Sequence, residues 1–192
     1  MTDTAEKVTK LDFGCGPHPK EGFEGVDILP FDGKVKHVLN IGRDPWPWAD
    51  NSVDEAHASH FIEHLTNLNG AWERCHFFNE LGRVLKPGAK CTLIFPHWAS
   101  NRYYGDPTHK EPFSEMGFYY LSKAWRDVNA PHSDGANNPG TYTCNLEATW
   151  GYAMRADLSV RNPEYQQYAL ANFKEAAQDM IATITKPLVP TT

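Results

Sequence analysis

The residues with the clearest chemical meaning lie in the segment LDFGCGPHPKEGFEGVDI, residues 11–28. An apolar run breaks at Gly14 and Gly16, and the chain then returns through Gly25 to a single carboxylate, Asp27. Glycine is used where φ must be positive or where a side chain would block a ligand. A carboxylate at the end of the second strand commonly binds the two hydroxyls of a ribose. The segment predicts a site for a nucleoside-containing cofactor, although the same glycine spacing also occurs in ordinary tight turns.

Two neighbouring residues narrow the kind of cofactor. The third position of a dinucleotide fingerprint must be small so that helix and strand can pack, and here it is Pro19. An acid, Asp12, stands two residues before the first glycine and gives the pattern D-x-G-x-G. These features argue against NAD or FAD. They favour a cofactor without a pyrophosphate, whose ribose and amino-acid tail occupy the turn.

Length and composition limit the class of protein. The chain has 192 residues, which suits one domain with a full core, and 41% of them are hydrophobic. No run approaches the roughly 20 apolar residues of a membrane-spanning helix, and the first residues lack the features of a signal peptide. Four cysteines without a C-x-x-C pair indicate a reducing, cytoplasmic setting. The formal net charge of −6, with no dense basic cluster, argues against nucleic acid and favours a small-molecule or protein substrate.

The elements that position this site alternate between strand and helix in the first half of the chain. Apolar residues at helical spacing predict one long helix, and Lys86-Pro87-Gly88 is a stop signal. The loop 42–52 contains Trp46 and Trp48, which either plug the core beneath it or form a wall of an adenine pocket. We predict strands at about 8–13, 25–27, 35–39, 53–59 and 91–95, and the helix at 69–86.

The second half is rich in aromatic residues and less regular. We predict one helix at 114–123, a mobile loop at 131–140, a strand at 141–155, a helix that begins at Asn162-Pro163, and a last strand at 180–189. The whole is an α/β, Rossmann-like, doubly wound and mostly parallel sheet with an antiparallel C-terminal strand. We expect a single domain over residues 1–192, in which 97–142 form a substrate-side insertion or cap.

Four segments, taken together and in order, resemble the class I S-adenosylmethionine-dependent methyltransferases. They cover about residues 8–98, and GDPTHKEPFS at 105–114 is similar to a segment of small bacterial and phage-type members. The four segments are LDFGCG (11–16), GVDI (25–28), WADNSVDEAHASHFIEHL (48–65) and ELGRVLKPGAKCTLIFPH (80–97).

The resemblance implies S-adenosyl-L-methionine as cofactor and a role for each matching residue. The methionine end of the cofactor would contact Asp12, Gly14, Cys15 and Gly16. The ribose would contact Asp27, with Ile28 beside it, and the adenine would contact Asn40 and Ile41. Ser59 would line the side of the methyl group.

The sequence departs from the family in two places. The first adenine-facing position is Asn40, where the family more often has Asp. Only residues 17–24 remain between the glycine turn and the second strand, whereas a parallel crossover normally takes a dozen or more. We therefore expect the first crossover helix to be reduced to a turn, which leaves the cofactor pocket more open on one side.

Methyl transfer needs in-line alignment and exclusion of water, and a hydroxyl acceptor would also need a general base. Histidine is the usual choice, and His60, His97 and His109 are the candidates that follow the predicted strands. Tyr104, Asp106 and His109 form a polar set for the acceptor. For each histidine the alternative is hydrogen bonding that shapes a loop. The aromatics of 98–125 form either an acceptor slot or a small satellite core.

Two other functions are compatible with parts of the sequence. His60-x-x-Glu63-His64 matches the inverted zinc-peptidase pattern, in which two histidines on a helix bind zinc. The methyltransferase-like context on both sides already explains this segment, so we expect no metal site. The other alternative is a non-catalytic protein that keeps the fold and binds a cofactor or a partner.

Overall fold

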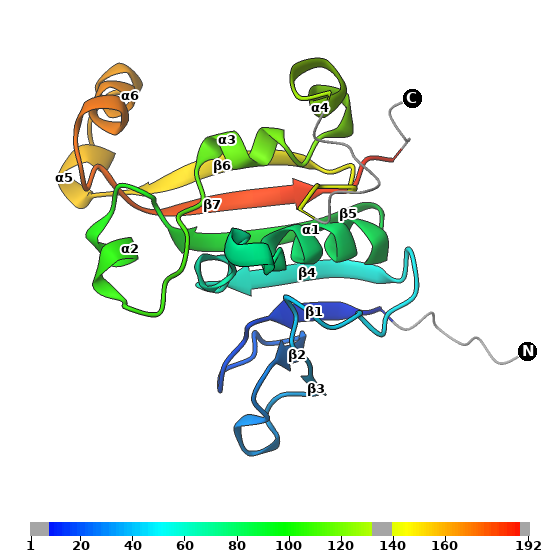
Figure 1. Ribbon diagram of the computed structural model, residues 1–192. Helices are drawn as coiled ribbons and strands as arrows, with labels where there is room; N and C mark the ends of the chain where they lie inside the picture. The colour runs from blue at the N-terminus through cyan, green and yellow to red at the C-terminus, as the bar shows by residue number, and fades with distance from the viewer. Residues whose placement is uncertain (1–7, 132–139, 189–192) are drawn as a thin grey trace, which may run out of the picture.

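The computed structural model describes residues 8–131 and 140–188, which are built around a seven-stranded sheet in the order β3-β2-β1-β4-β5-β7-β6 (Figure 1). The strands β1 to β5 are parallel, and β7 is antiparallel to both β5 and β6. This confirms the predicted α/β class and the antiparallel C-terminal strand. The strand bounds are β1 Lys10–Phe13, β2 Glu24–Asp27, β3 His37–Val38, β4 Val53–Ser59, β5 Leu85–Pro96, β6 Glu147–Met154 and β7 Ala177–Thr185.

The core lies between the middle strands and helix α1 (Glu73–Val84), which lies lengthwise over β4 and β5 in Figure 1. Alternate residues of β1, Leu11 and Phe13, are fully buried. Phe77 and Leu81 of α1, one turn apart, pack into the same cluster. Each large apolar side chain that is fully buried contributes about 1.5–3 kcal/mol. This layer fixes the carboxyl ends of β1 and β4, where the site is found.

The first crossover contains turns and no helix, as predicted. The buried carboxylate of Asp12 provides part of the stabilisation that a helix would give to this crossover. Its Oδ2 accepts a 2.8 Å hydrogen bond from the backbone N–H of Lys20, and its Oδ1 lies 2.7 Å from Nδ1 of His57 on β4. One acid on β1 therefore ties the short crossover to the neighbouring strand.

Helix α1 is shorter than the predicted range 69–86. It begins only at Glu73 because Asn69 and Trp72 have positive φ, 55° and 51°, which interrupts a right-handed helix. The predicted stop at Pro87-Gly88 lies inside β5, which begins at Leu85. The register with β4 jumps between Val53 and Glu55, so proline and glycine fall in an irregular stretch of the ladder.

The second half differs from its prediction in detail. The single helix predicted at 114–123 is two helices, α3 (Glu115–Tyr119) and α4 (Lys123–Asn129). The chain leaves helical geometry at Ser122, which is extended and caps α4 by accepting a hydrogen bond from the N–H of Trp125. Helix α6 (Pro163–Asn172) begins after Asn162 as predicted. Two short helices were not predicted, α2 (Asn101–Gly105) and α5 (Ala156–Ser159).

The last two strands are displaced from their predicted ranges. Strand β6 begins at Glu147, because residues 141–146 instead bond to α1, where Asn79 Oδ1 accepts from the N–H groups of Thr143 and Cys144. Strand β7 ends at Thr185, before Pro187, which cannot donate to a ladder. Most of the loop predicted at 131–140 lies outside the described residues. Among the described residues, no helix combines the length and the apolar character needed to cross a membrane.

Candidate functional site

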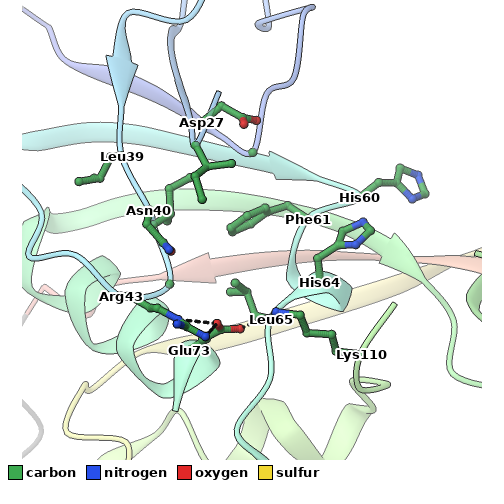
Figure 2. Close-up of a pocket in the computed structure, with 14 residues that line it drawn as sticks. Asp27, Leu39, Asn40, Arg43, His60, Phe61, His64, Leu65, Glu73 and Lys110 are labelled. Atoms are coloured by element: carbon green, nitrogen blue, oxygen red, sulfur yellow. Dashed lines mark hydrogen bonds and ion pairs between the residues drawn. The ribbon is translucent and has the colours of Figure 1, made fainter. Parts of the chain in front are cut away.

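A cavity of about 500 Å³ opens at the carboxyl ends of β1, β2, β3 and β4 (Figure 2). Ligands of open parallel sheets bind at this edge, where loops from several strands converge. Six of the residues predicted from the sequence line it. The lining residues are Gly14, Asp27, Ile28, Leu39, Asn40, Ile41, Gly42, Arg43, His60, Phe61, His64, Leu65, Glu73 and Lys110.

The glycine turn after β1 is bonded to the acid at the end of β2. The backbone N–H of Gly14 donates to the carbonyl of Val26 at 2.8 Å, and that of Gly16 donates to Oδ2 of Asp27 at 2.9 Å. Oδ1 of Asp27 accepts from the N–H of Leu29 at 3.2 Å. Both glycines have positive φ, 65° and 55°, which only glycine adopts readily. The turn therefore holds the Asp27 carboxylate in one orientation at the cavity wall.

The close approach that requires a glycine at position 14 is made by a side chain of this protein. A Cβ at Gly14 would lie 2.3 Å from Cδ2 of Phe61, well inside van der Waals contact. Figure 2 shows the Phe61 ring pointing from the end of β4 toward Asn40. The space at Gly16, in contrast, is open, with no atom within 4 Å of a Cβ placed there. A ligand lying over the glycine turn would therefore find open space beside Gly16, whereas Phe61 fills the space beside Gly14.

Four predicted cofactor residues do not line the cavity. One is Gly16, whose backbone N–H bonds to Asp27. Asp12 is buried beneath the turn and bonds to the crossover, as described above. The Cys15 thiol donates to the carbonyl of Gly16, and burial together with the carboxylates of Asp12 and Asp27 raises its pKa to about 11. Ser59 is the last residue of β4, one position before His60. These residues shape the site from outside, and their direct contact with a cofactor stays a prediction.

The adenine side of the predicted site is formed by Asn40 and Ile41, which follow β3 and line the cavity. The carbonyl of Ile41 accepts a 3.0 Å hydrogen bond from Nε1 of Trp46. Trp46 is 4% exposed and packs against Phe13 with ring centroids 4.4 Å apart. Of the two alternatives for these tryptophans, Trp46 therefore fills the core beneath the loop and does not form a wall of the adenine pocket. Trp48 lies partly buried beside it.

The opposite wall carries an ionic cluster that the sequence did not predict. Glu73, at the start of α1, lies 2.8 Å from Nη2 of Arg43 and 3.0 Å from Nζ of Lys110. These two cations and the N–H of Thr66 keep the pKa of Glu73 below its usual range against the opposing effect of burial, which is the largest single influence. No sequence pattern identifies this trio, because it joins three distant segments.

Of the predicted catalytic residues, only His60 lines the cavity. His60 has φ 52°, and its Nδ1 lies 3.4 Å from Oε1 of Glu63; this carboxylate raises the pKa of His60 despite partial desolvation. His109 lies just behind the wall, with Nδ1 2.6 Å from the carbonyl of Tyr103. The residues 60–64 form a bend and a 3-10 turn, so the helix that the zinc-peptidase pattern requires is not formed.

His97 and Tyr104 lie outside the cavity. His97 is buried, with Nε2 3.5 Å from Oε1 of Glu115 and Nδ1 accepting from the N–H of Ala99. Tyr104 is 68% exposed and lines a separate hollow of about 280 Å³ between α2 and the end of α6. The predicted polar set is therefore divided, because Tyr104 lines this separate hollow, whereas His109 lies behind the wall of the first cavity with its Nε2 3.9 Å from Oδ2 of Asp106. His97 thus forms hydrogen bonds within the fold, which was the alternative to a role as general base.

A buried arginine holds together the two loops that close the site. Arg74 of α1 donates to the carbonyls of Ile62, Leu65 and Glu111 at 3.3, 3.0 and 2.7 Å, and to that of Pro112 at 3.3 Å. The loop after β4 and the loop that carries His109 and Lys110 are thus fixed to one side chain.

Comparison with protein-family models gives no match, and comparison with curated protein sequences gives none either. The fold, however, matches solved structures. A SAM-dependent methyltransferase from Archaeoglobus fulgidus aligns with a TM-score of 0.60 and 19% identity, over 94% of this chain and 87% of that one. A complex between a methyltransferase activator of Haloferax volcanii and a methyltransferase gives 0.55 and 14% identity, over 95% and 84%.

A third structure is the geranyl diphosphate C-methyltransferase of Streptomyces coelicolor, in complex with Mg²⁺, geranyl diphosphate and S-adenosyl-L-homocysteine. It aligns with a TM-score of 0.52 and 16% identity, over 94% of this chain and 74% of that one. At these low sequence identities, the similarity to the solved structures shows a shared fold and no more. The chain thus has the Rossmann-like fold of the SAM-dependent methyltransferases.

Proposed function

We propose that this chain is an S-adenosyl-L-methionine-dependent methyltransferase whose cofactor binds in the cavity at the carboxyl ends of β1 to β4, called here the main cavity because it lies at this edge of the sheet. The observation that carries the proposal is the meeting of Asp27, Asn40 and the glycine turn at one edge of a sheet with this strand order. The solved structures with this fold support it, because they are methyltransferases and one holds S-adenosyl-L-homocysteine.

The residues at the β2 and β3 side suit the nucleoside. Each oxygen of Asp27 accepts one backbone N–H, and each retains a second lone pair that can accept a ribose hydroxyl. Leu39, Asn40 and Ile41 provide the neighbouring wall for an adenine ring. The open space beside Gly16 leaves room for the methionine end.

The residues at the β4 side suit the acceptor. When bound, the cofactor would supply an electrophilic methyl group on its sulfonium. His60 directs Nδ1 toward Glu63, which leaves Nε2 to accept the proton of an acceptor hydroxyl as its oxygen bonds to the methyl carbon. The electrons of the broken C–S bond remain on sulfur as a neutral thioether. Phe61 would exclude water from the line of transfer.

The acceptor that we propose is a small molecule or a protein side chain. The net charge of −6 disfavours nucleic acid. The segment 97–142 acts in this proposal as a cap, since Lys110 reaches from it into the cavity. A methyltransferase with this fold occurs in complex with an activator protein, which supports a protein partner as an option. No disulfide joins the four cysteines, which fits our proposal of a cytoplasmic protein.

One observation favours a second candidate function, a non-catalytic protein on the same fold. The Phe61 ring lies against Gly14, where the family resemblance would place the methionine end of the cofactor. A protein that has lost its cofactor would tolerate such packing.

Calorimetric titration with S-adenosyl-L-homocysteine tests the proposal. We expect one molecule to bind per chain, and transfer of labelled methyl from S-adenosyl-L-methionine to a component of a metabolite or protein extract. Absence of binding would overturn the cofactor assignment. Binding without transfer to any acceptor in either extract would favour the non-catalytic candidate.

A further inference from the structure

A carboxylate without a hydrogen bond lies behind the cavity wall. The side chain of Glu63 is 2% exposed, and neither of its oxygens accepts a well-formed hydrogen bond from the described residues. A buried carboxylate needs a compensating charge, since without one it costs several kcal/mol. Two histidine nitrogen atoms lie within 4 Å of its Oε1, His60 Nδ1 at 3.4 Å and His109 Nε2 at 3.8 Å. A positive charge close to Glu63 would offset this cost.

Two histidines beside Glu63 each present a bare nitrogen. Nδ1 of His109 lies 2.6 Å from the carbonyl oxygen of Tyr103, which can only accept, so Nδ1 carries the proton. Nδ1 of His64 lies 3.3 Å from both the carbonyl and the hydroxyl oxygen of Thr108. That hydroxyl donates its own proton to Asp106 at 2.6 Å, so it accepts from His64. In the neutral tautomers, both Nε2 atoms therefore keep their lone pairs.

We propose that Glu63, His64 and His109 bind one divalent transition-metal ion. One ligand atom from each residue lies within 4.8 Å of the other two, and the rings of His64 and His109 are 4.8 Å apart. Two imidazoles and one carboxylate suit zinc, or iron, cobalt and manganese, better than magnesium. Histidine ligands characteristically donate their second nitrogen to a carbonyl, as both do here.

The packing of the two loops prepares this site before any ion binds. The N–H of Lys110 donates to the carbonyl of Glu63 at 2.9 Å, which joins the loop of His109 to the loop of His64. Arg74 clamps the same two loops from beneath. Ligands from distant parts of the sequence are thus held in place by bonds that do not involve the ligand atoms.

The ion would also lie next to the proposed acceptor side. His60 and His64 both line the main cavity, and Figure 2 shows them together at the end of β4. A divalent cation lowers the pKa of a hydroxyl that it coordinates and stabilises the resulting oxygen anion. If the proposed methyl transfer holds, on which this step rests, the acceptor is a hydroxyl compound that uses the fourth position of the ion.

The test is a titration of chelator-treated, full-length protein with Zn²⁺, Co²⁺, Mn²⁺ and Mg²⁺, followed by calorimetry and, for Co²⁺, by visible absorption. We expect one equivalent of Zn²⁺ or Co²⁺ to bind, with a Co²⁺ d–d spectrum, and Mg²⁺ to bind far more weakly. His109→Ala and His64→Asn should each weaken binding by roughly 100-fold or more. The matched control is His18→Asn, an exposed histidine distant from the cluster in sequence, which should bind like the wild type.

The rival explanation is a proton on His109, which would form an ion pair with Glu63 and need no metal. Glu63→Gln separates the two. Under our proposal it loses metal binding and leaves the metal-free protein as stable as the wild type or more so. If no ion binds stoichiometrically to the wild type, or if Glu63→Gln binds it unchanged, the proposal is overturned. S-adenosyl-L-homocysteine is titrated into the same samples, so that failure of the metal site is distinguished from failure of the cofactor site.

Discussion

The backbone N–H of Gly16 donates a 2.9 Å hydrogen bond to Oδ2 of Asp27 and thereby joins the turn after β1 to the last residue of β2. These are the two ends of the pattern that gives the sequence its clearest functional signal. Their contact explains why the spacing matters, because a short crossover brings the turn back to the acid without a helix between them.

Asp27→Asn is expected to weaken binding of S-adenosyl-L-homocysteine by roughly 10- to 100-fold, about 1.5–3 kcal/mol, because a charged acceptor of ribose hydroxyls is replaced by a neutral amide. Isothermal titration calorimetry measures the effect. Asp32→Asn is the matched control, since Asp32 is an exposed acid with positive φ that does not line the cavity. Equal affinity of Asp27→Asn and wild type would remove Asp27 from the ribose site.

Gly14→Ala is expected to destabilise the fold by more than Gly22→Ala. Both residues have positive φ, 65° and 79°, so both substitutions carry the backbone strain of about 1–2 kcal/mol. Only Gly14 faces a side chain, and overpacking against Phe61 should add about 1–3 kcal/mol. Denaturant unfolding measures both. In the Gly14→Ala background, Phe61→Leu should recover part of the loss, and additive effects would contradict the contact.

Arg74→Met is expected to lower the free energy of unfolding by about 2–4 kcal/mol, since buried carbonyls lose their donor while the apolar stem is kept. Urea denaturation measures the change. The control is Arg161→Met, an exposed arginine whose replacement should change stability by less than about 0.5 kcal/mol. Hydrogen exchange should also show faster opening of residues 60–65 and 106–112 in Arg74→Met. Unchanged protection there would contradict the role of Arg74 as a clamp between the loops.

Acid should weaken the packing of α3 against β6 through Glu115. The hydrogen bond with His97, together with that from the Tyr152 hydroxyl, holds the pKa of Glu115 at about 2, below its ordinary value of 4.5. A carboxyl group whose pKa is lower in the folded than in the unfolded protein stabilises the fold at pH values above its pKa in the unfolded state. This stabilisation is lost as the pH falls through its pKa in the folded state. Stability should therefore decline between pH 4.5 and 2, by an amount reduced by the partial exposure of the group.

Glu115→Gln should flatten this acid dependence, whereas Glu147→Gln, at an exposed glutamate of β6, should leave it as in the wild type. Thermal melts followed by circular dichroism across this pH range make the comparison. The same slope in Glu115→Gln and wild type would contradict the assignment.

The first four strands and the proposed nucleoside end of the site were predictable because their signals are local. Residues 53–59 were predicted as a strand with the bounds that β4 has, and Asp27 was placed at the tip of β2. The other wall of the cavity was not predictable, because Arg43, Glu73 and Lys110 meet there from distant segments of the chain. The left-handed Trp72 and the Phe61 ring over Gly14 are tertiary effects, which override local propensity and leave no periodic pattern.

The position of β7 between β5 and β6 has a consequence for how the chain is synthesised. While the polypeptide emerges from the ribosome, β6 has no neighbour to pair with until residues 177–185 are also free of the exit tunnel. The part of the sheet that carries the proposed cofactor site, formed by β1 to β4, can assemble well before that moment. A released chain truncated after Met154 should therefore carry β6 without its partner strand, a natural target for chaperones, and pairing of β7 with both β5 and β6 completes the sheet.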